Sequence, residues 1–214
     1  MGIKGQFFIV TAIIVIMALF LIKSSLNLAD IIERKRYLEM GLERKEFMNI
    51  RDEFLNVVAY SYNKNETSNI KTYLDYIFSK LAARSTDLKG LDVESSYPTA
   101  SSGVQTRLNV TVYNFLGTTI SKLNVSFSYD FTSNKSFSNI PDGMYTNTYF
   151  NFITASSTNY TLIVYYETSA ENKTYNIQIP VEIGKSKFIG FFDLRMTTLR
   201  SENSDEAVKV VDVA

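Results

Sequence analysis

The feature of the sequence that most constrains the fold is an apolar run near its amino terminus. Residues 7–22 contain no charged side chain, and Thr11 is the single polar residue among them. A helix over this run is about 24 Å long, which approaches the roughly 30 Å thickness of a bilayer's hydrocarbon core. With Lys4 and Lys23 extending toward the headgroups, the run predicts a transmembrane helix over residues 6–23, and a lipid bilayer as its partner.

Two other interpretations of the run are open. A helix buried in a protein core would need to be covered on every face. A secretory signal peptide would be removed on export, but the residues after Lys23 offer no small-x-small cleavage site. The membrane helix is the interpretation that the pattern favours.

The residues before the run suggest a family. A short basic leader ends in Lys4 and Gly5, polar Gln6 follows, and the apolar helix then begins. This arrangement resembles the class III signal of archaeal type IV pilin-like proteins. The resemblance implies that a prepilin peptidase cuts between Gly5 and Gln6, and that the apolar helix contacts other pilin-like subunits.

One residue departs from the family's pattern. The acidic residue that many pilins carry five positions into the mature helix would fall at Val10, which has no charge. Val10 cannot neutralise the amino terminus of a neighbouring subunit. Two functions therefore stay open: a membrane-anchored pilin-like structural or adhesion protein, and a single-span surface or sensor domain that does not polymerise.

The composition argues against an enzyme and against a nucleic-acid partner. The sequence has no histidine, cysteine or tryptophan, which removes the commonest general base, the usual zinc ligands and the thiolate nucleophile. The 22 Lys and Arg residues equal the 22 Asp and Glu residues in number, so no basic excess indicates nucleic-acid binding. We therefore expect no catalytic residue, no metal and no cofactor.

The region after the run has a helical pattern and many charges. Apolar residues recur at three-to-four spacing to about residue 62, and again in a second segment at Ile70, Tyr73, Leu74, Ile77, Phe78 and Leu81. A short polar connection between the two segments favours antiparallel packing of their apolar faces. The sequence thus predicts a leader over residues 1–5 and, after the membrane helix, a helical hairpin stalk over residues 24–94. A partner-binding groove is the alternative use of these apolar faces.

Beyond residue 103 the apolar period changes from 3.6 to 2. Residues 108–112, 123–131, 160–166 and 175–183 alternate between apolar and polar side chains, with turn signals between them. This pattern predicts an antiparallel β-sandwich of five to seven strands over residues 103–198, with Pro180 in an edge strand and a flexible tail over residues 199–214. The hairpin over residues 108–127 resembles immunoglobulin-like modules of prokaryotic surface proteins. The fold class predicted is α+β.

Six Asn-x-Ser/Thr sequons bear on the location of the domain. They are candidate N-glycosylation sites in an exported protein, at Asn65, Asn109, Asn124, Asn134, Asn159 and Asn172. The positive charges after the run would keep the domain in the cytoplasm, but long domains translocate largely regardless of charge. We therefore expect a single-pass cell-membrane protein with its C-terminal domain outside, facing a surface ligand that the sequence does not identify.

Overall fold

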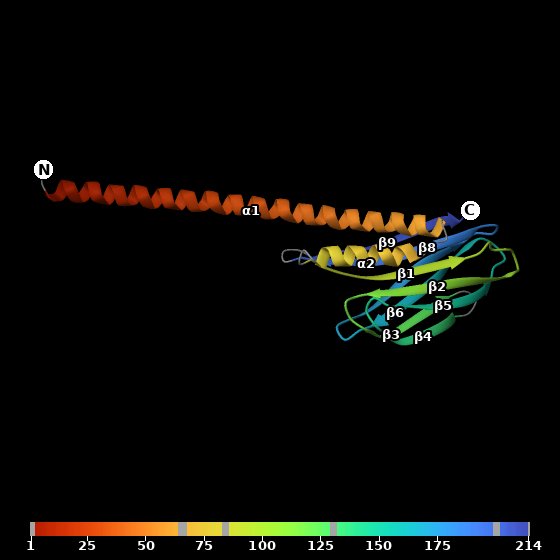
Figure 1. Cartoon of the computed structure of the whole chain (residues 1–214). Helices are drawn as coiled ribbons and strands as arrows, with labels where there is room; N and C mark the ends of the chain where they lie inside the picture. Colours follow the sequence, from red (N-terminus) through yellow and green to blue (C-terminus); the bar gives the residue numbers. More distant parts are fainter. Residues whose placement is uncertain (1–2, 64–67, 83–85, 129–131, 199–201, 214) are drawn as a thin grey trace. The chain divides into compact units, whose positions relative to one another are not determined.

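The computed structural model of the chain describes residues 3–63, 68–82, 86–128, 132–198 and 202–213 (Figure 1). The chain divides into two compact units, residues 1–46 and residues 47–214, and each is described by itself. Helix α1 (Ile3–Asn63) contributes to both units, and helix α2 (Ser68–Ala82) belongs to the second. We call residues 47–214 the head.

The head contains two antiparallel sheets. In the described residues, a five-stranded sheet has the order β5-β2-β1-β8-β9 and a four-stranded sheet has the order β4-β3-β6-β7. The strands are β1 (Asp87–Tyr97), β2 (Gln105–Phe115), β3 (Ile120–Ser128), β4 (Thr132–Ile140), β5 (Tyr145–Ile153), β6 (Thr158–Glu167), β7 (Asn172–Val181), β8 (Ser186–Thr197) and β9 (Glu202–Val213). The central strand β1 pairs with β2 along one side and with β8 along the other.

Two apolar cores hold three layers together. The first core lies between the sheets, where alternate side chains of both meet; its largest fully buried members include Tyr97, Tyr166, Phe127 and Phe152. The second core lies between the outer face of the five-stranded sheet and the helices. Figure 1 shows α2 running beside β1, with the four-stranded sheet on the opposite side of the five-stranded one.

The helix layer of the head forms because both helices bury a stripe at helical spacing. In α1 the buried side chains are Phe47, Ile50, Phe54 and Val58, and in α2 they are Ile70, Leu74, Ile77 and Leu81. The rings of Phe54 and Phe192 of β8 stack with centroids 3.9 Å apart. Helix α2 runs antiparallel to this part of α1 (Figure 1), and the Tyr73 hydroxyl donates to the backbone oxygen of Ile50. The predicted packing of the second helical segment against the first is confirmed.

A glycine sets the distance between α1 and β8. A Cβ atom added at Gly190 would lie 3.1 Å from Cγ1 of Val58 and 3.4 Å from the ring of Phe188. These contacts are tighter than ordinary van der Waals packing, so a larger residue would push the helix outward. Gly190 therefore allows Val58 to be fully buried.

The predicted transmembrane helix over residues 6–23 is wrong. Within the described residues, no helix combines the length and the apolar character that crossing a bilayer requires. The apolar side chains that the structure describes here, residues 13–22, extend over about 15 Å of helix, about half of a hydrocarbon core of about 30 Å. The run is instead the first part of the 61-residue helix α1, which continues into a charged stretch.

The remaining fold predictions are partly corrected. The sandwich is confirmed, as is the edge position of the strand that holds Pro180. Gly117 and Gly143 lie between strands, and their φ angles are both 72°. The helical stalk over residues 24–94 is wrong at its end, because Asp87–Tyr97 forms β1. The tail over residues 199–214 contains strand β9. The predicted fold class, α+β, is corrected to mostly β, because the described residues form nine strands and two helices.

Candidate functional site

The first candidate site is the apolar part of α1 whose side chains the structure describes. Its large apolar side chains are between 50% and 72% exposed: Ile13, Ile14, Val15, Ile16, Met17, Leu19, Phe20, Leu21 and Ile22. We call residues 13–22 the apolar segment. Soluble monomers rarely expose so large a contiguous apolar surface, and such surfaces mark sites of association.

The same unit has a second, more dilute apolar stripe. Ile31, Leu38 and Leu42 lie at spacings of seven and four residues, on one face of α1, and are 58–70% exposed together with Ile32. Charged side chains surround them, among them the pair Lys35 and Glu39, whose Nζ and Oε1 atoms are 3.8 Å apart. The apolar side chains that recur along α1 are therefore exposed in this unit and buried in the head.

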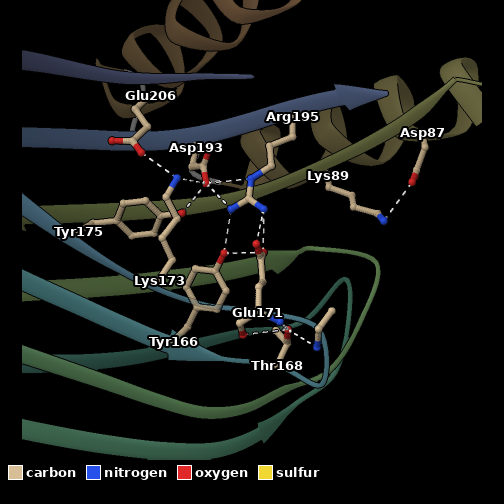
Figure 2. A network of polar contacts seen from close by, with 11 residues as sticks. Asp87, Lys89, Tyr166, Thr168, Glu171, Lys173, Tyr175, Asp193, Arg195 and Glu206 are labelled. Carbon is tan, nitrogen blue, oxygen red and sulfur yellow. Dashed lines mark hydrogen bonds and ion pairs between the residues drawn. The ribbon is translucent and has the colours of Figure 1, made fainter. Parts of the chain in front are cut away.

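The second candidate site is a network of charged and tyrosine side chains that joins the two sheets (Figure 2). Asp193 of β8 is at its centre and is 1% exposed. Its Oδ2 atom accepts from Lys173 Nζ at 3.1 Å, from Arg195 Nη2 at 2.8 Å and from the hydroxyl of Tyr175. Burial opposes the ionisation of Asp193, but hydrogen bonds from Arg195 and Tyr175 outweigh it and lower its pKa.

The turn between β6 and β7 holds the other end of the network. The carboxylate of Glu171 accepts two bonds from Arg195 Nη1, at 2.7 and 2.6 Å, and one from the Tyr166 hydroxyl at 2.7 Å. The Thr168 hydroxyl accepts from the backbone N–H of Glu171 at 3.1 Å and fixes this turn. Burial opposes ionisation of Glu171, and the hydrogen bonds from Arg195 and Tyr166 still lower its pKa.

An open pocket of about 570 Å³ lies beside this network. Strand β9 adds carboxylates to its wall, at Glu202, Asp205 and Glu206. Two of them have cationic partners: Glu206 binds Lys173 at 2.8 Å, and Asp205 binds Arg51 of α1 at 2.5 Å. Because the charges at the centre of the network pair with one another, the network holds β7, β8 and β9 together.

A third cluster is buried beneath the helices. Asp92 and Glu94 of β1 are 0% and 6% exposed, and alternation along the strand places both on the face that the helices cover. Both oxygens of Asp92, Oε1 of Glu94 and the hydroxyl of Ser61 in α1 have no hydrogen-bond partner among the described residues. Burial raises the pKa of Glu94 to about 8, and burial together with the charge of Glu94 raises that of Asp92 well above its usual range.

The structure does not gather the sequence-predicted site residues in one place. Lys4, Gly5 and Gln6 lie in α1, and their side chains fall outside the described ones. The sequon at Asn65 lies outside the described residues. Exposed sequon asparagines occur on four strands, at Asn109, Asn134, Asn159 and Asn172. Asn124 is half-buried, and its Oδ1 atom is buried without a described partner, so it is the least accessible of the five.

Sequence reasoning missed the network and the buried acid pair. Their members are separated in the sequence, and no single motif contains Glu171, Asp193 and Glu206. One signal was available: Asp193 and Arg195 interrupt the apolar part of β8 that begins at Phe188. Among the described residues, no group of three or more carboxylates is placed to hold a metal ion.

Comparison with known proteins adds no family. No protein-family model matches the chain, and no curated protein matches its sequence.

Proposed function

We propose that the chain is a pilin-like structural subunit of the cell surface, in which the apolar segment packs against the same segment of neighbouring copies. The observation that supports this proposal is the exposure of the nine large apolar side chains of residues 13–22. Burying one side chain of this size contributes about 1.5–3 kcal/mol, so contact among several copies would be strongly favourable. The head would not take part in this contact between apolar segments.

The proposal includes processing and location. A prepilin-type peptidase would cut between Gly5 and Gln6, leaving the apolar helix on the mature protein. Exposed sequons on β2, β4, β6 and β7 support an extracellular head, because a glycan on any of them would project away from the cores. Mass spectrometry of the protein from its native membranes or surface tests the cleavage: the mature chain should begin at Gln6, and one that begins at Met1 contradicts it.

Sedimentation and electron microscopy of the purified full chain test the assembly. The wild-type protein should form particles that pellet at high speed, and Ile16→Asp should return it to small species, because a carboxylate cannot enter an apolar contact between helices without a large cost. The matched control is Met144→Asp, which alters an apolar side chain of the head that is 53% exposed, against 65% for Ile16. A wild-type chain that stays monomeric would instead favour the non-polymerising surface domain, and equal effects of both variants would contradict the role of the apolar segment.

A further inference from the structure

One part of the five-stranded sheet is not covered by the helix layer. The second core contacts β1, β8 and the end of β2, whereas the outer side chains of β5 and of the first half of β2 are exposed. Along β5 these side chains alternate between rings and amides before an isoleucine, in the order Tyr145, Asn147, Tyr149, Asn151 and Ile153. We call these five residues, together with Arg107 of β2, the tyrosine ladder.

Within the tyrosine ladder, the ring of Tyr149 holds Arg107 in place. Its guanidinium carbon lies 3.8 Å from the ring centroid of Tyr149, and Arg107 pairs with Asn151 across the strands. No described residue accepts a hydrogen bond from its guanidinium, whereas Arg51 and Arg195 in the head both bind carboxylates. A planar guanidinium stacked on a ring keeps its N–H donors in a fixed plane, which suits a carboxylate ligand.

The charge on this face restricts the ligand. The exposed side chains of β2 and β5 on this side include one cation, Arg107, and no carboxylate. A nucleic acid would require several basic side chains to neutralise its phosphates. The complementary ligand is therefore mostly uncharged, with an occasional carboxylate.

The spacing of the ladder restricts the ligand further. Side chains on one face of a strand repeat about every 7 Å, so rings and amides alternate along a straight line. Tyrosine rings offer an apolar face with a polar edge, and each asparagine both donates and accepts hydrogen bonds. A chain of sugar rings, with apolar C–H faces and hydroxyl edges, presents the matching groups at repeating intervals.

We infer that the tyrosine ladder binds a linear polysaccharide that contains uronate sugars, with Arg107 contacting a sugar carboxylate and Tyr149 and Tyr145 supporting sugar rings. This inference goes beyond the proposed assembly, because it depends on the head alone. Asn109 lies opposite Tyr149, so a glycan on this sequon would occupy the same surface. The binding experiment therefore uses protein made in a host that does not glycosylate asparagine.

Isothermal titration calorimetry of the full chain tests the inference with three probes: a manno-oligosaccharide that carries a single mannuronate residue, a neutral manno-oligosaccharide of equal length and free mannuronate. The acidic oligosaccharide should bind best. Arg107→Gln and Tyr149→Ala should each weaken its binding about 10-fold or more, as expected for the loss of a charge-assisted bond or a stacking surface. If the Ile16→Asp variant binds the three probes with the same order of affinities, binding at the tyrosine ladder does not require assembly.

A second cation–ring pair supplies the control. Lys122 Nζ lies 6.0 Å from the ring centroid of Tyr165, on the four-stranded sheet. Lys122→Gln and Tyr165→Ala should change the affinity less than twofold. The inference is overturned if no oligosaccharide binds, if the neutral and acidic ones bind equally, if free mannuronate binds as tightly as the oligomer, or if the control variants lose as much affinity as those of the ladder.

Discussion

The two units of the chain contain the same helical pattern of apolar residues but differ in whether these side chains are covered. In residues 1–46 the apolar side chains of α1 that the structure describes are exposed, whereas in the head Phe47, Ile50, Phe54 and Val58 of the same helix are buried. Both stretches have apolar residues at three-to-four spacing. The periodicity therefore identifies a face that needs a cover, and only the tertiary structure shows whether the same chain provides that cover.

The largest expected difference between the units is in the cost of removing an apolar side chain. Phe54→Ala should destabilise the head by about 3–5 kcal/mol, because it leaves a cavity beneath Phe192. Leu38→Ala, at a side chain that is 70% exposed, should change the free energy of unfolding by less than about 0.5 kcal/mol. Urea denaturation followed by circular dichroism measures both. Similar values for the two variants would contradict the difference between the units.

An intermediate effect on the stability of the head is expected from pH. The pKa of Glu94 is raised from 4.5 to about 8 and that of Asp92 is raised as well, so the folded state holds protons that the unfolded state releases. The contribution of this pair to the free energy of unfolding should be greatest below about pH 4.5 and should fall as the pH rises toward 8. The slope is up to about 1.4 kcal/mol per pH unit for each group.

Glu94→Gln together with Asp92→Asn should flatten this slope, because the amides do not titrate. Urea denaturation at several pH values between 5 and 8 provides the measurement. As a control, Glu182→Gln removes a carboxylate of the head whose pKa is lowered to about 2 by hydrogen bonds from Lys185 and Lys187, so the slope between pH 5 and 8 should stay unchanged. A wild-type head whose stability rises through this range would show that the pair is ionised in the folded state.

The smallest expected effect on stability comes from replacing either of two glycines, Gly41 or Gly190, with alanine. Gly41→Ala adds a methyl group where nothing lies within 4 Å, and should stabilise α1 by up to about 1 kcal/mol through helix propensity. Gly190→Ala adds one against Val58 and should destabilise the head by about 1–3 kcal/mol. Thermal melting with separate helix and near-ultraviolet signals distinguishes them. Stability changes of opposite sign for the two variants would support the difference between the units, and changes of equal sign would contradict it.

Sequence reasoning succeeded where one local pattern determines the structure. The alternating strands β2, β3, β6 and β7, the stripe of α2 and the edge position of Pro180 could all be predicted from their neighbours in the sequence. Strand β1 could not, because Asp92 and Glu94 place charges where a buried strand normally has apolar residues. Strand β9 begins with Glu202, Asp205 and Glu206, which resemble the composition of a solvated tail.

The candidate sites were less predictable for a different reason. The charged network forms only when the β6–β7 turn, β8 and β9 meet, and the tyrosine ladder forms only when β2 and β5 pair. Such contacts depend on the strand order, which a local pattern does not determine. The apolar segment was identified correctly as a feature, but its ten residues make about 15 Å of helix, which is too short for the membrane role assigned to it.

The pairing of β1 with β8 has a consequence for how the head forms. Asp87–Tyr97 must wait for Ser186–Thr197 before the central sheet can close, and a ribosome adding 5–20 residues per second needs roughly 5–20 s to cover that distance. Pairing between such distant stretches is also slow by nature. During that interval β1 can pair with β2, but the edge of β1 that β8 will later cover stays open on the nascent chain, while the apolar segment has already been made.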